Sequence, residues 1–400
     1  MRVLISGAGI AGPTLAYWLV RYGFETTIVE KAHALRTGGY VIDFWGSGFE
    51  VAERMGLLEE IRRKAYLVEE VRAVDRSGKH IAGFPATAFG RAICGRYVSL
   101  PRGELASAIF ASIGPNVETL FGDSISAMRE SDSGIQVSFE SGVSRKFDFV
   151  VGADGLHSRV RELTFGPESQ FEKFLGYKVA AFGIDGYQAR DELVYFMYTE
   201  VGQQVARFAM RNDRTMFLFT FADPDPDTGN PAAQKELLRR RFGASGWECP
   251  AILDALERAD ELYFDRVSQI SMDAWSSGRV ALVGDAAYCV SLLAGQGSAL
   301  AMAGAYILAG ELHRANGDCR SAFARYQELF GPFIQSKQQA ALRFAGAFAP
   351  KSTFSLWLRN LLLNLLRIGW IADLTIGRDL ADRIKLPDYG RALSTDGHTD

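Results

Sequence analysis

The sequence begins with MRVLISGAGIAG, Met1–Gly12, and this N-terminal stretch is the strongest indication of the fold. Arg2–Ser6 is a short apolar run typical of a buried strand, and three glycines follow it in the spacing G-x-G-x-x-G. Glycines at this spacing allow a tight turn out of the strand, close approach of the backbone to a pyrophosphate, and close packing of helix on strand. The residues between Gly12 and Gly23 have the apolar content of a buried helix. The stretch therefore predicts the first strand–turn–helix unit of a Rossmann-like fold.

A second apolar run, Thr26–Val29, ends in the acidic residue Glu30. In a dinucleotide-binding fold, an acidic side chain at the end of the second strand accepts hydrogen bonds from ribose hydroxyls. A glycine-rich turn that binds no ligand would not explain Glu30, so we predict a dinucleotide site. The residues assigned to its N-terminal part are Gly7, Gly9, Ile10, Ala11, Gly12, Glu30 and Lys31.

Two later segments are further strands that end in aspartate, FDFVVGADGLHSRVR (Phe147–Arg161) and GRVALVGDAAYCVSLLAGQG (Gly278–Gly297). Taken singly, either segment is equally well an ordinary strand-to-helix turn. An aspartate at the carboxyl end of a parallel strand lies where open α/β sheets bind ligands, and it can accept a ribityl hydroxyl. The turn that ends the second segment opens a helix whose N–H groups suit negative charge on a reduced flavin. The residues assigned from these segments are Asp154, Gly284, Asp285, Gly295, Gly297 and Ser298.

In this order, the three motifs resemble those of the FAD-dependent aromatic-hydroxylase-type (group A) flavoprotein monooxygenases. That family has an N-terminal glycine motif, a central D-G-x-x-S-x-x-R motif and a C-terminal G-D motif, and the resemblance covers residues 1 to about 345. Within the family, the sequence is most similar to the tetracycline destructases. The stretches that carry this similarity are Arg36–Gly39 with Asp43, Gly46–Leu58, Gly284–Leu312 and, more weakly, Gly246–Ile270.

The resemblance implies non-covalently bound FAD. It also implies transient docking of NADPH, because the sequence has a single G-x-G-x-x-G and therefore no second nucleotide-binding fold. It also implies Arg36, Gly39, Asp43 and Arg102 as further cofactor-binding residues. The implied reaction is hydride transfer to FAD, formation of a flavin C4a-hydroperoxide with O2, and transfer of one oxygen atom to an aromatic or polyketide-like substrate. Tetracycline is the sharpest candidate, which would make the protein an antibiotic-resistance enzyme. No catalytic side chain is expected, because the flavin carries the chemistry.

The expected fold is α/β, with a Rossmann-like FAD-binding domain, an inserted antiparallel β-sheet as substrate-binding domain, and C-terminal helices. The FAD-binding domain is expected over residues 1–67, 96–176 and 265–320, and the substrate-binding domain over 68–95 and 177–264. The C-terminal helices are expected over 321–385. Gly46–Lys64 is expected to be helical, and the polar tail beyond Leu386 is expected to be frayed.

The strands expected in the inserted sheet are rich in aromatic residues, and alternate side chains of a strand point to opposite faces. Rings on the face toward the flavin would suit a flat polycyclic substrate. The alternative is that most of these rings pack in the core. The candidate pocket residues are Phe182, Tyr198, Phe208, Phe217 and Phe219.

One loop departs from the family pattern. Where the family often has C-P-S-P-L-S-G-Q-G, this sequence reads CVSLLAGQG over Cys289–Gly297, with Val290 and Leu292 at the proline positions. Both residues have a freer φ and an additional backbone N–H. Because the loop borders the reactive edge of the flavin in the family, the change is expected to affect hydroperoxide lifetime or substrate choice.

Composition favours an ordinary globular enzyme. Of the 400 residues, 48% are hydrophobic and 23% charged, and the net charge of −3 gives no reason to expect nucleic acid as a partner. The four cysteines are scattered without C-x-x-C and the five histidines are isolated, so no metal site is expected. No signal peptide precedes the first strand, and we expect a cytoplasmic monomer or dimer.

The apolar segment Phe354–Ile376 is the one part of the sequence that suggests a membrane. Arg359 and Arg367 would be costly at the centre of a bilayer, so a membrane-spanning helix is not expected. Two amphipathic helices packed on the protein explain the segment. A peripheral membrane contact, with both arginines toward lipid headgroups, is the other interpretation.

Two other functions remain open from the sequence alone. One is a flavoprotein that oxidises, reduces or halogenates, although the W-x-W-x-I-P pattern of flavin halogenases is absent. The other is a flavoprotein that sequesters a ligand without hydroxylating it.

Overall fold

The computed structural model describes residues 1–36, 38, 40–86, 95–189, 191–367 and 384–390. A six-stranded sheet has the order β17-β18-β11-β1-β2-β7, and all its pairings are parallel except that of β17 with β18. Three separate parts of the sequence supply it. Its strands are β1 (Arg2–Ser6), β2 (Glu25–Glu30), β7 (Glu118–Phe121), β11 (Phe149–Gly152), β17 (Ser276–Ser277) and β18 (Val280–Leu282).

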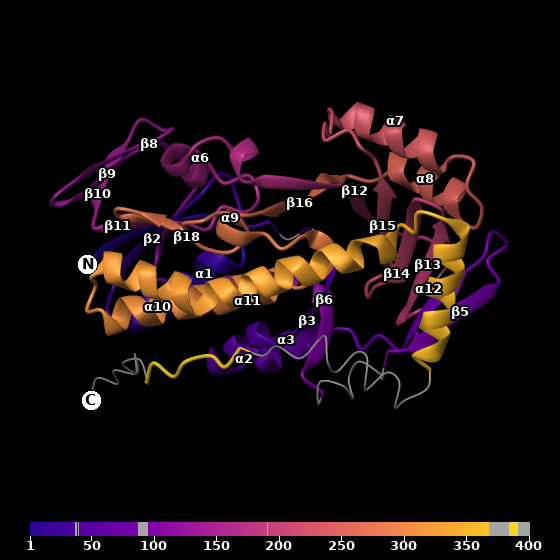
Figure 1. Ribbon diagram of the computed structural model, residues 1–400, viewed down its shortest axis with the longest axis horizontal. Coiled ribbons are helices and arrows are strands. Elements are labelled where there is room, and N and C mark those ends of the chain that lie inside the picture. Colours follow the sequence, from indigo (N-terminus) through magenta and orange to yellow (C-terminus); the bar gives the residue numbers. More distant parts are fainter. Residues whose placement is uncertain (37, 39, 87–94, 190, 368–383, 391–400) are drawn as a thin grey trace.

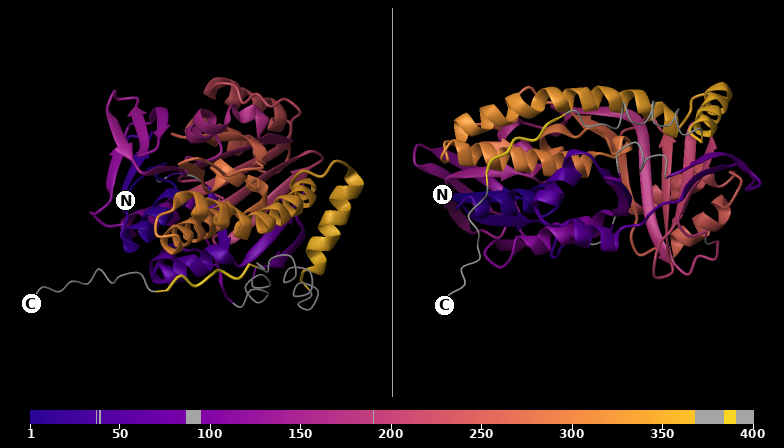
Figure 2. Two further views of the ribbon diagram at one scale, coloured as in Figure 1. Left: turned by 60° about the vertical axis from the view of Figure 1, so that its left-hand side comes forward. Right: turned by 90° about the horizontal axis from the view of Figure 1, so that it is seen from below.

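A small antiparallel sheet, β8 (Ile125–Ser131), β9 (Gly134–Phe139) and β10 (Ser144–Phe147), lies with α6 on one side of this sheet, and α1, α10 and α11 lie on the other (Figure 1). The long helix α11 runs from the six-stranded sheet to the far end of the molecule, and Figure 2 shows α10 beside it (Figures 1 and 2). The helices of this part are α1 (Ala11–Arg21), α2 (Ser47–Arg54), α3 (Leu58–Lys64), α5 (Arg102–Ser112), α6 (Arg159–Phe165), α9 (Asp285–Tyr288), α10 (Gly297–Arg314) and α11 (Cys319–Phe348).

A seven-stranded sheet in the order β16-β12-β15-β14-β13-β4-β5 forms the other half. It confirms the inserted sheet, but β13 pairs with β4 in parallel rather than antiparallel fashion. No hairpin joins these two strands, because the chain between them passes through the six-stranded sheet, so nothing imposes antiparallel pairing. The strands are β4 (Glu70–Val74), β5 (His80–Pro85), β12 (Glu172–Asp185), β13 (Val194–Glu200), β14 (Gln203–Ala209), β15 (Arg214–Ala222) and β16 (Tyr263–Ile270).

Two helices, α7 (Pro231–Phe242) and α8 (Cys249–Glu257), cover one face of the seven-stranded sheet (Figure 1). A third, α12 (Thr353–Leu365), packs near β5. A two-stranded ribbon, β3 (Val41–Trp45) with β6 (Tyr97–Pro101), and the 3₁₀ turns η1 (Glu168–Gln170) and η2 (Leu292–Ala294) complete the described elements.

Two local expectations are corrected. The helix expected over Gly46–Lys64 is broken into α2 and α3, because Gly56 adopts φ +74° and ends the first helix. The segment after Leu386 is packed rather than frayed up to Tyr389, whose hydroxyl donates to Glu311 Oε1 of α10 at 2.8 Å.

No helix within the described ranges combines the length and apolarity needed to cross a bilayer.

Candidate active site

The motif-bearing strands β1, β11 and β18 are parallel neighbours, so their carboxyl ends lie at one edge of the six-stranded sheet. The segments that follow them touch. A Cβ placed on Gly284 would stand 3.2 Å from Ala11 Cβ at the start of α1, and one on Gly297 would stand 3.7 Å from Asp285 Oδ1. Sequence positions nearly 300 residues apart therefore assemble into one site.

The glycines of the first motif have different reasons for being glycine. Gly7 has φ +108°, and a Cβ there would lie 2.5 Å from the carbonyl oxygen of Ala153. A Cβ on Gly12 would lie 2.0 Å from the carbonyl oxygen of Gly7, so helix and strand require glycine here. A Cβ on Gly9 would meet only Arg102 Nη2, at 3.7 Å. The fold itself leaves room at Gly9, so the space is open to a ligand.

The Glu30 carboxylate is fixed by the backbone at the end of β2. Its Oε2 accepts from the N–H of Ala8 at 2.8 Å, and its Oε1 accepts from the N–H of Ala32 at 2.9 Å. Each oxygen keeps a further lone pair. The carboxylate is thus oriented to accept the hydroxyls of a ribose.

The N-termini of two helices, α1 and α10, have no side-chain cap. Ile10 precedes α1 and Gln296 precedes α10, and neither makes a side-chain capping hydrogen bond. Neither helix has an acidic residue in its first turn. Free N–H groups and the positive dipole end suit anionic ligand groups, such as a pyrophosphate at α1 and a charged flavin ring at α10.

Arg102 and Asp285 place opposite charges across the site. The Arg102 backbone N–H donates to the carbonyl of Tyr40 at 3.0 Å, and no carboxylate in the described part of the chain lies within ion-pair distance of its guanidinium. Burial raises the pKa of Asp285, and the positive charge of Arg102 opposes this rise. The Asp285 carboxylate interacts with the Cys289 thiol and keeps further lone pairs. An arginine without a carboxylate partner suits a pyrophosphate, and a carboxylate with lone pairs to spare suits a hydroxyl, as FAD requires.

The Asp154 carboxylate mainly makes hydrogen bonds within its own motif. Its carboxylate accepts from the Ser158 hydroxyl, from the Val160 N–H at 3.1 Å and from the Ser6 hydroxyl at 3.4 Å. Arg161 of the same motif is fully buried and donates to the carbonyl of Ala286 at 3.0 Å. The D-G-x-x-S-x-x-R motif thereby joins the second site segment to the third.

The other assigned residues differ in exposure and in their contacts. Lys31 and Arg36 are exposed, Ser298 is half-buried in the first turn of α10, and Gly39 is outside the described residues. Asp43 lies on the β3–β6 ribbon, where its Oδ1 accepts from the hydroxyls of Tyr97 and Ser99, both at 2.6 Å.

Four of the five aromatic pocket candidates lie on the face of the seven-stranded sheet that α7 and α8 cover. Phe182, Tyr198, Phe217 and Phe219 are buried in the core beneath α7 and α8. The Phe219 ring centroid, for example, lies 4.9 Å from that of Phe242 in α7. They are corrected to core residues, because two helices with apolar stripes need an apolar sheet face to pack on.

Phe208 is on the opposite face of the sheet. Its ring lies 5.5 Å from Tyr66 and 6.5 Å from Tyr195, with Met216 beside them. Burial, and the negative charge of Asp43, raise the pKa of Tyr195. The sequence interpretation did not select Tyr66 or Tyr195. Strand alternation starting from Phe208 would have indicated Tyr195, its cross-strand partner.

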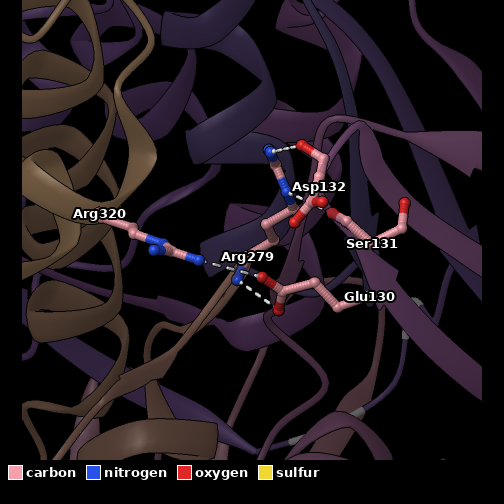
Figure 3. Close-up of a pocket in the computed structure, with 5 residues that line it drawn as sticks. All are labelled: Glu130, Ser131, Asp132, Arg279 and Arg320. Carbon is pink, nitrogen blue, oxygen red and sulfur yellow. Dashed lines mark hydrogen bonds and ion pairs between the residues drawn. The ribbon is translucent and has the colours of Figure 1, made fainter.

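A surface hollow of about 400 Å³ lies between the end of β8, the β17–β18 turn and the start of α11 (Figure 3). It is lined by Glu130, Ser131, Asp132, Arg279 and Arg320. The Arg279 guanidinium already donates to three backbone carbonyls, and Arg320 pairs with Glu130 at 3.6 Å. This hollow is a closed network of internal contacts, not a candidate active site.

The sequence matches the family described as FAD binding domain over residues 1–322. A flavin-dependent monooxygenase of an unknown prokaryotic organism is 35% identical over 348 residues, which cover 84% of this chain and 87% of that protein. The chain is a flavin-dependent monooxygenase of this family. An uncharacterized protein of Mycobacterium tuberculosis is 40% identical over 339 residues, covering 84% of this chain and 91% of that protein. The structure of the tetracycline destructase Tet(55) superposes with a TM-score of 0.83 at 32% identity, covering 97% of this chain and 98% of that one.

The loop without prolines is held in this monooxygenase by two glutamines. Gln269 Nε2 donates to the carbonyl of Val290 at 3.0 Å, and Gln338 Nε2 donates to the carbonyl of Cys289 at 3.2 Å. Ser291 has φ +108°, an unusual conformation for a residue with a Cβ. Side-chain hydrogen bonds from β16 and α11 therefore restrain a loop whose residues alone would leave it freer.

His157 of the monooxygenase joins the FAD-binding part to the seven-stranded sheet. Its Nε2 lies 3.5 Å from Asp265 Oδ2, and its Nδ1 lies 3.0 Å from Glu168 Oε1. Hydrogen bonds to Asp265 and Glu168 raise the pKa of His157 from 6.5 to about 10.

His157 is expected to stabilise the monooxygenase only where its ring is charged in the folded state. Because folding raises this pKa, the contribution is complete below about pH 6.5 and is lost as the pH rises to about 10. The side chain is 55% exposed, so we expect less than about 1 kcal/mol. Melting temperatures of the parent and His157→Gln proteins should differ most at acidic pH and converge at alkaline pH. A difference that grows with pH would contradict this assignment.

Proposed function

We propose that this flavin-dependent monooxygenase uses NADPH and O2 to insert one oxygen atom into a polycyclic aromatic or polyketide-like substrate, with tetracycline as the sharpest candidate. The observation that carries the proposal is the convergence of Arg102, Asp285 and two uncapped helix N-termini at one sheet edge. The likeness to the tetracycline destructase Tet(55), over 97% of the chain, supports the substrate class.

The residues present fit FAD. Glu30 is oriented for the ribose, Gly9 and Arg102 leave room and charge for the pyrophosphate, and Asp285 can accept a ribityl hydroxyl. The first turn of α10 suits negative charge on the flavin ring. FAD bound there would supply hydride acceptance and O2 activation, and the protein would supply orientation and a dry site.

The substrate is proposed to bind between the seven-stranded sheet and the loop Cys289–Gly295. Tyr195 and Met216, half-buried beside the buried Phe208 ring, offer an apolar surface on the sheet. The hydroxyls of Tyr97 and Tyr195, with the carboxylate of Asp43, offer polar contacts for the hydroxyl and carbonyl edge of a polycyclic phenol. This combination of one apolar face and one polar edge supports a fused, planar substrate.

NADPH is proposed to dock at the rim and leave again. Within the described ranges, the six-stranded sheet is the only parallel nucleotide-binding sheet, and its site is assigned to FAD. The exposed cations Lys31 and Arg36 support a contact with the additional phosphate of NADPH.

The test incubates the FAD-loaded protein with NADPH and tetracycline and follows O2 uptake and the mass of the drug. We expect O2 uptake and a product heavier by about 16 Da, one oxygen atom. NADPH oxidation that yields only hydrogen peroxide would contradict the tetracycline assignment. Simple phenols and anthraquinones tested in the same way then separate another hydroxylase from an oxidase or a ligand-sequestering flavoprotein.

A pair of neighbouring residues tests the proposed substrate face. Tyr195 and Phe196 follow one another on β13 and point to opposite faces of the sheet. We expect Tyr195→Leu to raise KM about tenfold, the loss of roughly 1.4 kcal/mol of aromatic contact. Phe196→Leu should lower the melting temperature and leave KM unchanged. Equal effects on KM would show that the substrate does not lie on the assigned face.

A further inference from the structure

Helix α12 packs on the molecule through a side that includes polar residues. Arg359 Nη1 donates to Thr199 Oγ1 at 2.9 Å and to Gln204 Oε1 at 3.2 Å, both on the seven-stranded sheet. Asn364 accepts from the N–H of Gly83 at 3.2 Å and donates to the carbonyl of Ile81 at 3.4 Å. Amphipathic helices normally bury their apolar side, whereas α12 partly buries only some of its apolar residues, such as Leu356 and Leu363 beside these polar groups, and leaves the larger stripe exposed. Arg359 is therefore not available for lipid headgroups, which corrects half of the peripheral-contact interpretation.

The apolar side of α12 is consequently in solvent. Its large residues recur at the helical spacing i, i+3, i+4, i+7 and i+8, which places them along one stripe. Phe354 is 67% exposed, Trp357 58% and Leu362 54%, and the first two rings stack at 5.9 Å. Figure 2 shows α12 standing at the outer margin of the molecule in the left view. The members of this stripe, called the α12 apolar face, are Phe354, Trp357, Leu358, Leu361 and Leu362.

The sequence around α12 is cationic. From Leu329 to Ala372 there is no acidic residue, although Asp and Glu make up 47 of the 400 residues of the chain. The same stretch contains five cations, and two of them, Lys351 and Arg367, are exposed immediately before and after the helix. This bias contrasts with the overall net charge of −3. The charge around the face complements an anionic surface.

We propose that α12 docks the monooxygenase on an anionic lipid bilayer, with the α12 apolar face inserted at the headgroup level. An exposed apolar stripe marks an interaction site, and a helix with Trp, Phe and Leu on one side and flanking cations fits the interface of a bilayer. Tryptophan is favoured at that depth. Acidic lipids supply the charge that the acid-free stretch complements. Docking of this kind does not depend on the proposed substrate.

The experiment uses full-length protein loaded with FAD and vesicles of phosphatidylglycerol with phosphatidylcholine, compared with phosphatidylcholine alone. We expect sedimentation with the anionic vesicles, weaker binding in high salt, and a blue shift of tryptophan emission. Trp357→Ser combined with Leu361→Ser should lower the partition coefficient at least about tenfold. Trp357→Phe should keep binding and lose most of the blue shift.

Val143→Ser is the matched control, because Val143 is 49% exposed on the β9–β10 turn at the opposite end of the molecule. It should bind vesicles like the parent. Flavin content and melting temperature of all variants check that they fold. Equal vesicle binding by the double variant and the parent would overturn the proposal. Two further results would also overturn it, because each shows that something else already covers the α12 apolar face. One is a parent dimer in sedimentation velocity that the double variant converts to monomer. The other is a Trp357 already shielded from acrylamide in the lipid-free protein.

Discussion

Gly12→Ala is expected to destabilise the protein by at least about 3 kcal/mol, because the new Cβ would stand 2.0 Å from the carbonyl oxygen of Gly7. Neither the oxygen, in the turn after β1, nor the first turn of α1 can move away without disturbing the core beneath them. Urea unfolding of the FAD-free protein measures the free energy of unfolding directly. We expect Gly12→Ala to unfold at much lower urea or to be recovered only as insoluble protein.

Gly9→Ala is the matched control, since it adds the same methyl group three residues earlier. Its Cβ would meet nothing closer than Arg102 Nη2 at 3.7 Å, and Gly9 has no positive φ. The free energy of unfolding of the FAD-free protein should therefore stay within about 1 kcal/mol of the parent. FAD affinity should fall, because the methyl group occupies the space proposed for the pyrophosphate. Unchanged FAD affinity in a folded Gly9→Ala protein would contradict that placement.

Asp285→Ala is expected to weaken FAD binding about ten- to a hundredfold, which corresponds to the loss of a charge-assisted hydrogen bond of roughly 1.5–3 kcal/mol. The carboxylate begins α9 beside Gly297, in the field of Arg102. Titration of the FAD-free protein with FAD, followed by flavin fluorescence, gives the dissociation constants.

Asp254→Ala is the control for removal of an acidic residue, because Asp254 is exposed on α8, outside the site. It should bind FAD like the parent. Asp285→Asn keeps one acceptor oxygen and should fall between the parent and Asp285→Ala. If Asp285→Ala holds FAD as tightly as the parent, the ribityl assignment of Asp285 is wrong.

The sequence was most informative where a residue type is dictated by backbone geometry. Gly7 and Gly12 are required by contacts of 2.5 and 2.0 Å with backbone oxygens, and such requirements leave a regular glycine spacing in the sequence. Glu30 ends β2 as expected, and its carboxylate faces the glycine-rich turn through the Ala8 N–H. The family and the overall fold were therefore predictable from three short motifs.

The sequence could not show which face of the seven-stranded sheet is covered by helices. Arg207 lies opposite Phe217 in the pairing of β14 with β15, and Phe208 is the next residue of β14, so Phe217 and Phe208 lie on different faces of the sheet. Both faces are apolar. Only the packing of α7 and α8 decides the matter. The same ambiguity affects α12, whose apolar stripe predicts a buried side, whereas Arg359 and Asn364 make hydrogen bonds from the side that packs and the stripe stays exposed.

Contacts between residues distant in the sequence were equally unpredictable. Gln269 and Gln338 restrain the loop that lacks prolines, yet they lie on β16 and α11, and glutamine at these positions carries no local pattern. His157 was visible within its motif, but its partner Asp265 comes from a strand more than 100 residues later. Such contacts follow from tertiary packing and not from spacing.

The proposed oxygen transfer is tested most directly by the fate of the oxygen atoms when the FAD-loaded protein turns over NADPH and tetracycline under isotopically heavy oxygen gas. We expect a product that carries one heavy oxygen atom per NADPH consumed, with the second atom released as water. An unlabelled drug, with all the heavy oxygen recovered as hydrogen peroxide, would refute the transfer of oxygen to tetracycline.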